Sequence, residues 1–163
     1  MKLLGEVLAW ACFVAVVGLL SVWPRYDTIE EDQAIVTVTF SHAANRIGEC
    51  RMLTQEDLNK LPPNMRKPTE CPRERHPVRI ELRSGDSMLY AEVLAPSGIW
   101  SDGKSNIYRR VIVPARTHDL FVGMNDSGGE QGFDFEKSKR TEISPGQNLV
   151  VRFDEQLHQF TIQ

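Results

Sequence analysis

The sequence predicts a mainly β fold: an antiparallel sandwich of seven to eight strands, with an N-terminal transmembrane helix and a short helical insertion. Three observations support this fold class. The segment Val7–Trp23 contains no charged side chain. Val78, Ile80 and Leu82 alternate with charged residues, which is the period of a half-buried strand. Runs rich in β-branched residues recur along the rest of the chain between Gly, Pro, Asn and Asp turns, a pattern typical of β-sandwiches.

The charge-free segment Val7–Trp23 lies near the N-terminus and predicts the cellular location of the protein. As a helix it spans roughly 26 Å at about 1.5 Å per residue, the short end of a transmembrane span. A cleaved signal peptide, the main alternative, needs small residues three and one positions before the cut, and the exit at 20–24 offers no such pair. We therefore expect a tail and anchor at 1–23, a tether at 24–33 and an extracytoplasmic domain at 34–163.

The orientation of the anchor is predicted from cysteines, because the charges on its two sides nearly balance. Lys2 stands before the span and Arg25 just after it. Cys50 and Cys71 are the only cysteines in the folded domain, and such a pair beside a proline-rich loop favours an oxidising compartment. We expect a Cys50–Cys71 disulfide and, in a bacterium, a single-pass protein of the inner membrane with a periplasmic C-terminal domain. A zinc site formed with His42 and His76, or two free thiols, are the alternatives.

A β-branched run at 34–40 predicts the first strand of the domain. An insertion at 41–77 follows, rich in proline and charge. Within it, Thr54 with Asp57 three positions later predicts a capped helix of about two turns. Pro62 and Pro63 are expected to end that helix.

The remaining strands follow from alternation and from the turns between them. We expect them at 78–83, 88–94, 107–113, 118–124, 133–143, 149–153 and 158–162. In an Ig- or transthyretin-like sandwich the alternating apolar residues face the interior. The predicted core residues are Val78, Ile80, Leu82, Leu120, Val122, Leu149, Val151 and Phe153.

Part of the chain resembles a known kind of sandwich. Residues 113–122, Phe133 and 143–151 share a proline turn, a His, an alternating strand and then Gly-Gln before a last strand. This pattern is similar to the second half of PEGA-type and carboxypeptidase-regulatory-like modules, although Arg116 stands where their turn usually has Gly. The resemblance implies a β-sandwich that serves interaction or attachment on envelope proteins, and it transfers no catalytic residue.

The sequence lacks the features that several classes of function require. A net charge of −3 and a pI of about 5.8 argue against a nucleic-acid binder. Residues 125–129 are similar to the Gly-Asp-Ser-Gly-Gly of trypsin-like proteases, but the domain is too short for their two barrels, and a polar hairpin loop explains the same residues. The four His and five Met are dispersed, so neither copper nor another metal or cofactor is expected.

Two classes of function remain. The first is a non-enzymatic accessory or assembly subunit that binds other membrane-protein subunits. The second is a free-standing anchored module for an envelope ligand such as a glycan, a peptide or a metal ion. Residues 46–83 hold nine Arg or Lys against six Asp or Glu, and long loops on rigid scaffolds often carry function. The predicted partner-binding residues are Arg66, Lys67, Arg73 and Arg75.

Overall fold

The computed structural model describes residues 2–23 and 29–163, which form two separate units, residues 1–30 and 31–163. The first unit is helix α1 (Lys2–Val22), which buries no residue and has a mean hydropathy of 2.3. It is the one helix in the described part of the chain that is long and apolar enough to cross a membrane. Arg25 and half of the predicted tether lie outside the described residues.

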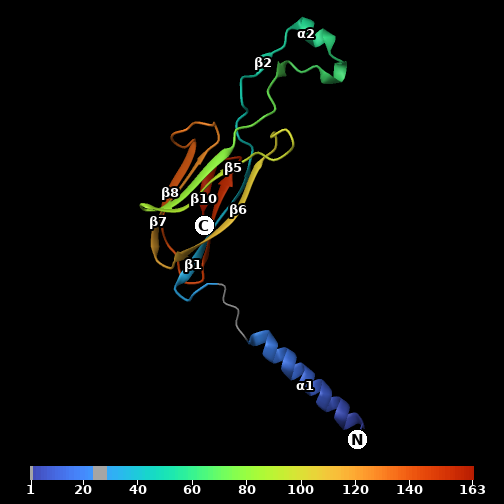
Figure 1. The fold of residues 1–163 in the computed structure, drawn as a ribbon, viewed down its shortest axis with the longest axis vertical. Helices are drawn as coiled ribbons and strands as arrows, with labels where there is room; N and C mark the ends of the chain where they lie inside the picture. Colours follow the sequence, from blue (N-terminus) through green and yellow to red (C-terminus); the bar gives the residue numbers. More distant parts are fainter. Residues whose placement is uncertain (1, 24–28) are drawn as a thin grey trace. The chain divides into compact units, whose positions relative to one another are not determined.

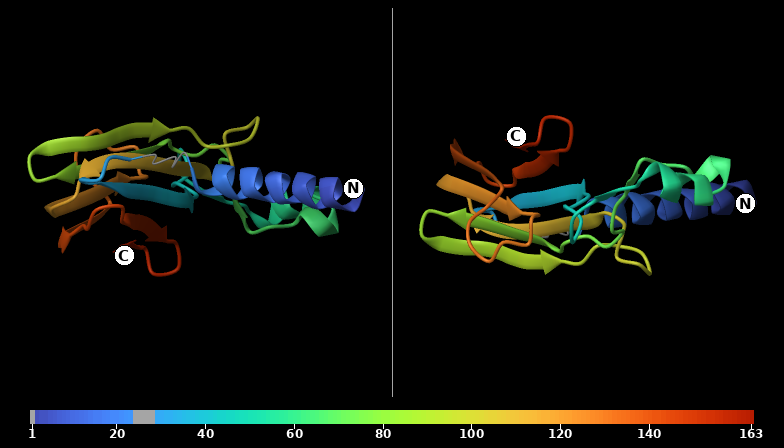
Figure 2. Two further views of the ribbon diagram at one scale, coloured as in Figure 1. Left: turned by 90° about the horizontal axis from the view of Figure 1, so that it is seen from below. Right: turned by 90° about the horizontal axis from the view of Figure 1, so that it is seen from above.

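The second unit stacks two four-stranded sheets, as Figures 1 and 2 show. Their strand orders are β10-β9-β1-β6 and β5-β4-β7-β8, and the mainly β fold with sandwich-like sheets is confirmed. The strands are β1 (Gln33–His42), β4 (Val78–Ser84), β5 (Ser87–Leu94), β6 (Ser105–Pro114), β7 (Thr117–Asn125), β8 (Phe135–Glu142), β9 (Asn148–Asp154) and β10 (Gln159–Ile162).

One pair departs from the antiparallel expectation. β9 pairs with β1 in parallel, with Thr37 opposite Val150 and Thr39 opposite Arg152, whereas every other neighbouring pair of the two sheets is antiparallel. The turn at 143–147 carries the chain from β8 in one sheet to β9 in the other. This turn ends beside the start of β1, where the Gly146 N–H donates to the Gln33 carbonyl. β9 therefore begins at the same end of the domain as β1 and runs in the same direction.

The predicted core is confirmed. Each of its eight residues is 5% exposed or less. They belong to one apolar cluster that also receives Val36 and Val38 from β1 and Phe160 from β10. Burial follows the period of two in β4, where Val78, Ile80 and Leu82 are all 0% exposed.

The direction of each strand shows at which end of the sandwich the connection that follows it lies. β1 begins at Gln33, where the tether joins the domain, and this end also holds the short connections at 85–86, 115–116 and 143–147. We call the opposite end, where β1 finishes at His42, the distal end. It carries the connections at 43–77, 95–104, 126–134 and 155–158. The first of these projects beyond the strands (Figure 1).

Candidate functional site

The distal end holds the longest connections of the described chain, and the largest is the predicted insertion. β1 continues to His42, paired there with Ser105 of β6, so the insertion covers 43–77 and begins two residues later than expected. Functional residues concentrate in long loops carried by rigid scaffolds. The distal end is therefore the candidate functional site.

A disulfide closes the outer part of the insertion. Cys50 and Cys71 are bonded, with their Cα atoms 4.1 Å apart, as the sequence predicts. The residues between them begin and end in a short antiparallel pair, β2 (Arg51–Met52) and β3 (Thr69–Glu70). We call residues 50–71 the disulfide lobe. Because the two sulfurs are bonded to each other, they cannot serve as the thiolate ligands of the alternative zinc site.

The helix predicted inside the lobe is present as α2 (Gln55–Lys60). The Thr54 hydroxyl accepts the Asp57 N–H, and the Asp57 carboxylate accepts the Thr54 N–H, which is the reciprocal cap that the spacing predicts. The helix ends at Lys60, with Leu61 as its C-cap, before a single 3₁₀ turn, η1 (Pro63–Met65). Alternation cannot reveal β2 and β3, because two residues are too short for a period.

The structure separates the four predicted partner-binding cations into two pairs. Arg75 and Arg73 lie where the insertion meets the sandwich. Arg75 Nη1 donates to the Ala44 carbonyl at 2.6 Å and Nε to the Asp102 carbonyl at 3.0 Å. Arg73 forms an ion pair with the Asp102 carboxylate at 2.7 Å. These two arginines fasten the insertion to the 95–104 loop, which is a positioning role.

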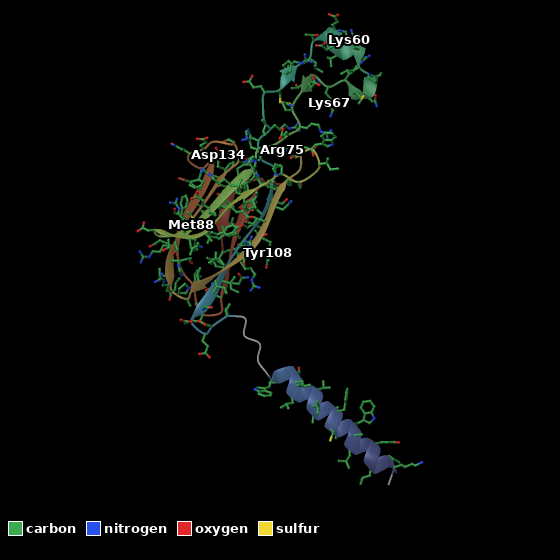
Figure 3. The ribbon with its side chains drawn as sticks, viewed as in Figure 1. Lys60, Lys67, Arg75, Met88, Tyr108 and Asp134 are labelled. Atoms are coloured by element: carbon green, nitrogen blue, oxygen red, sulfur yellow. A yellow bond between two sulfur atoms is a disulfide. The ribbon has the colours of Figure 1, made fainter. Side chains whose placement is uncertain are left out.

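Arg66 and Lys67 instead belong to the disulfide lobe, and both are exposed. Arg66 Nε donates to the Leu61 carbonyl at 3.0 Å. The Lys67 ammonium has no hydrogen bond or ion pair among residues 2–23 and 29–163. In Figure 3 Lys67 lies out on the lobe, whereas Arg75 lies at its base. Lys67 also lines an open hollow of about 610 Å³ together with Leu53, Met65 and the disulfide.

The 95–104 loop, which Arg73 and Arg75 contact, presents an apolar tip. Ile99 is 96% exposed and Trp100 is 68% exposed. The tip is held by its own backbone, with Ser101 N–H donating to the Gly98 carbonyl and Gly103 N–H to the Ser97 carbonyl. An ordered loop that exposes tryptophan beside arginines has the composition of a protein-contact surface.

Under the loops, a buried polar network joins the distal ends of the strands. His42 Nε2 lies 2.7 Å from Asp126 Oδ2, and both side chains are more than nine-tenths buried. Asn45 Nδ2 donates to the other Asp126 oxygen at 3.2 Å. The His42 ring packs edge-on against Phe153 with centroids 5.1 Å apart. This network is not among the features predicted from the sequence. The signal for it is alternation, since His42 and Asp126 continue the inward-facing positions of β1 and β7.

The network contains a His–Asp pair without a nucleophile. Ser127, the serine of the protease-like motif, donates its hydroxyl to the Asp134 carboxylate at 2.9 Å instead of meeting His42. Asp134 also accepts the N–H groups of Asp126 and Ser127. Residues 126–129 therefore form a polar loop after β7, and among the described residues no serine, threonine or cysteine side chain is hydrogen-bonded to the His42 ring.

Two carboxylates of the distal end are held in their charged form. The hydrogen bond from Lys104 Nζ, at 2.6 Å, lowers the pKa of Glu155, and burial opposes it only in part; the charges of Lys104 and His42 lower it further. For Asp134, burial raises the pKa, but the N–H groups of Asp126 and Ser127 and the Ser127 hydroxyl outweigh it, so the net shift is downward.

We expect these carboxylates to make the distal end sensitive to acid. A depressed folded-state pKa stabilises the fold above the ordinary carboxyl value, 4.5 for Glu155, and that stability is lost as pH falls through the lower folded value. Glu155→Gln should therefore flatten the decline of thermal stability between neutral pH and pH values below 4.5. The matched control is Glu142→Gln. Glu142 is the last residue of β8, at the end of the sandwich where β1 begins, and its carboxylate has no partner among the described residues. An equal decline in wild type and Glu155→Gln would contradict this assignment.

The chain matches no model of a known protein family and no curated protein sequence. The resemblance of residues 113–151 to PEGA-type modules therefore remains a prediction.

Proposed function

We propose that this chain is a non-enzymatic accessory or assembly subunit of a bacterial inner-membrane complex. Helix α1 serves as its single membrane anchor, and the sandwich stands in the periplasm. The apolar helix supports the anchor. The Cys50–Cys71 disulfide supports the oxidising compartment, because structural disulfides persist outside the reducing cytosol. The absence of a nucleophile beside the described His42–Asp126 pair supports a non-enzymatic role.

The observation that carries this proposal is the exposed insertion at the end of the sandwich remote from the tether. A connection between β1 and β4 needs few residues, yet this one contains a disulfide-closed lobe with its own helix cap. Arg73 and Arg75 hold the base of the insertion to the 95–104 loop, which leaves Arg66 and Lys67 for the partner. The Ile99–Trp100 tip lies in the 95–104 loop, to which the base of the insertion is fastened, and we propose that it extends the same contact surface.

The test is the size of the complex after extraction in a mild detergent. Wild type should co-migrate with other membrane subunits, and Arg66→Ser/Lys67→Ser should release them without lowering the melting temperature, because neither side chain contacts the sandwich. Arg116→Ser/Arg140→Ser removes the same charge outside the distal end and should keep the complex intact. Arg73 and Arg75 are left unchanged, since their loss would loosen the lobe itself.

A wild-type protein that migrates as a monomer would contradict the accessory role and favour the free-standing binding module. Retention of every partner by Arg66→Ser/Lys67→Ser would place the contact elsewhere. The two results are distinguishable because the first concerns the wild type and the second only the variant.

The proposed orientation makes a separate prediction. A reporter that is active only in an exported compartment, fused after Gln163, should be active, because the anchor is uncleaved and the disulfide forms outside the cytosol. A second reporter that is active only in the cytoplasm, at the same position, should be silent. The opposite pattern would overturn both the periplasmic location and the oxidising environment of the cysteines.

A further inference from the structure

The outer faces of the two sheets differ in how they are covered. On the β5-β4-β7-β8 sheet, Arg83 lies over the Phe121 ring at 4.3 Å and Arg79 over the Phe133 ring at 5.3 Å. Phe133 in turn lies against Gly123, where a Cβ would come within 2.6 Å of the ring. Two arginines therefore cover aromatic rings on this face, while Met88 and Val93 on β5 remain 52% and 61% exposed.

On the outer face of the β10-β9-β1-β6 sheet, Ile35 and Thr37 of β1 are buried, and no cation of the described residues lies over an aromatic ring. Tyr108 is 70% exposed and Ile112 is 55% exposed. Arg110 and Arg152 are exposed, and neither guanidinium has a partner in the described part of the chain. Asp154, the carboxylate at the end of this face, accepts the N–H groups of its own turn. Two arginines are thus left without a counter-charge.

One of these arginines borders a hollow. Tyr108 on β6 and Arg152 on β9 are the partners of Thr39 on its two sides. The hollow between them is shallow and open to solvent, with a volume of about 450 Å³. Its lining includes polar Thr39, Ser41 and Asn106 and apolar Phe40, Ile107 and Phe153. Tyr108 stands out from β6 in Figure 3. An aromatic ring, hydroxyls, an amide and an unpaired guanidinium therefore converge on one place.

Both edges of this sheet are protected against an added strand. At the β10 edge, Lys137 donates to the Phe160 carbonyl and Lys139 to the Ile162 carbonyl, each at 2.8 Å. At the β6 edge, Arg109 lies over the Tyr90 ring and beside Glu92. Charged side chains at a sheet edge disfavour strand addition, which is the usual binding mode of an extended peptide on a sheet.

We propose that the hollow over Thr39 binds a carboxylate-bearing saccharide. Sugar hydroxyls both donate and accept hydrogen bonds, as Thr39, Ser41 and Asn106 do. The exposed Tyr108 ring offers an apolar surface to the C–H face of a sugar ring. The Arg152 guanidinium matches a carboxylate with two parallel N–H groups. This site lies on a sheet face, so it requires neither the disulfide lobe nor the proposed partner.

The experiment titrates the full chain in lipid nanodiscs with trigalacturonic acid by calorimetry, and with its methyl ester, which keeps the rings and removes the charge. The acid should bind and the ester should bind at least about tenfold more weakly, because a charge-assisted hydrogen bond is lost. Arg152→Gln should weaken binding of the acid by a similar factor, and Tyr108→Leu should weaken binding of the acid and of the ester alike. Arg116→Gln, an arginine outside this face, should stay within about twofold of wild type.

Thermal melting of each variant shows that it remains folded, as expected for exposed side chains. Equal binding of acid and ester, or an Arg152→Gln variant that binds like wild type, would overturn the proposal. A tetraglutamate peptide that binds as tightly as the acid would overturn the saccharide assignment in favour of an acidic protein segment. Arg66→Ser/Lys67→Ser should bind the acid normally, so failure here is separable from failure of the accessory role.

Discussion

Phe153→Ala is expected to lower the free energy of unfolding by about 3–5 kcal/mol. Phe153 is 5% exposed. Its ring centroid lies 5.1 Å from those of His42, Phe135 and Phe160, so truncation removes contacts with three rings at once. The cavity that remains adds to the lost transfer free energy, because its rigid surroundings relax only in part. Chemical denaturation of the full chain, followed by circular dichroism, measures the change.

Two variants serve as references for this measurement. Leu120→Ala, at a site 1% exposed on β7, should cost about 2–5 kcal/mol by the same mechanism. Leu157→Ala, at a site 65% exposed in the turn before β10, should change stability by about 0.5 kcal/mol or less. A loss below about 1 kcal/mol for Phe153→Ala would mean that the opposite face of β9 is the buried one.

The second large effect is expected on the disulfide lobe. Replacing Cys50 and Cys71 by Ser releases a loop whose ends are 21 residues apart, which in the chain-entropy model removes about 3 kcal/mol of stabilisation. The lobe has no buried core of its own, because none of its residues is buried. We therefore expect the lobe to lose order while the sandwich core stays folded.

Hydrogen exchange distinguishes this local effect from a global one. The amides of Leu53 and Leu58, which donate to backbone carbonyls within the lobe, should exchange faster in the double Ser variant. Amides of β1 and β4 should keep their wild-type protection, because the disulfide lobe packs against neither strand's core face. Cys12→Ser, which leaves the disulfide intact, is the matched control. Loss of protection throughout β1 would show that the lobe supports the whole fold.

The local features of the fold are predictable from the sequence because each depends on residues close together in the chain. The alternation at Val78, Ile80 and Leu82 predicts β4 and its buried face, since side chains of a strand alternate between faces. Thr54 and Asp57 predict the start of α2 because a helix cap involves residues three positions apart. The hydropathy of residues 2–22 predicts α1 for the same reason.

The pairing of β1 with β9 is not predictable in this way, because residues 35–39 and 148–152 meet only after two sheets have stacked. The candidate site shows the same limit. Its cations are evident in the sequence, but the positioning role of Arg75 depends on the Asp102 carbonyl, 27 residues away. His42 and Asp126 are 84 residues apart. Local propensity and alternation thus determined the elements and their buried faces, whereas the tertiary structure alone decided which distant polar groups meet, because loop closure and sheet stacking bring them together.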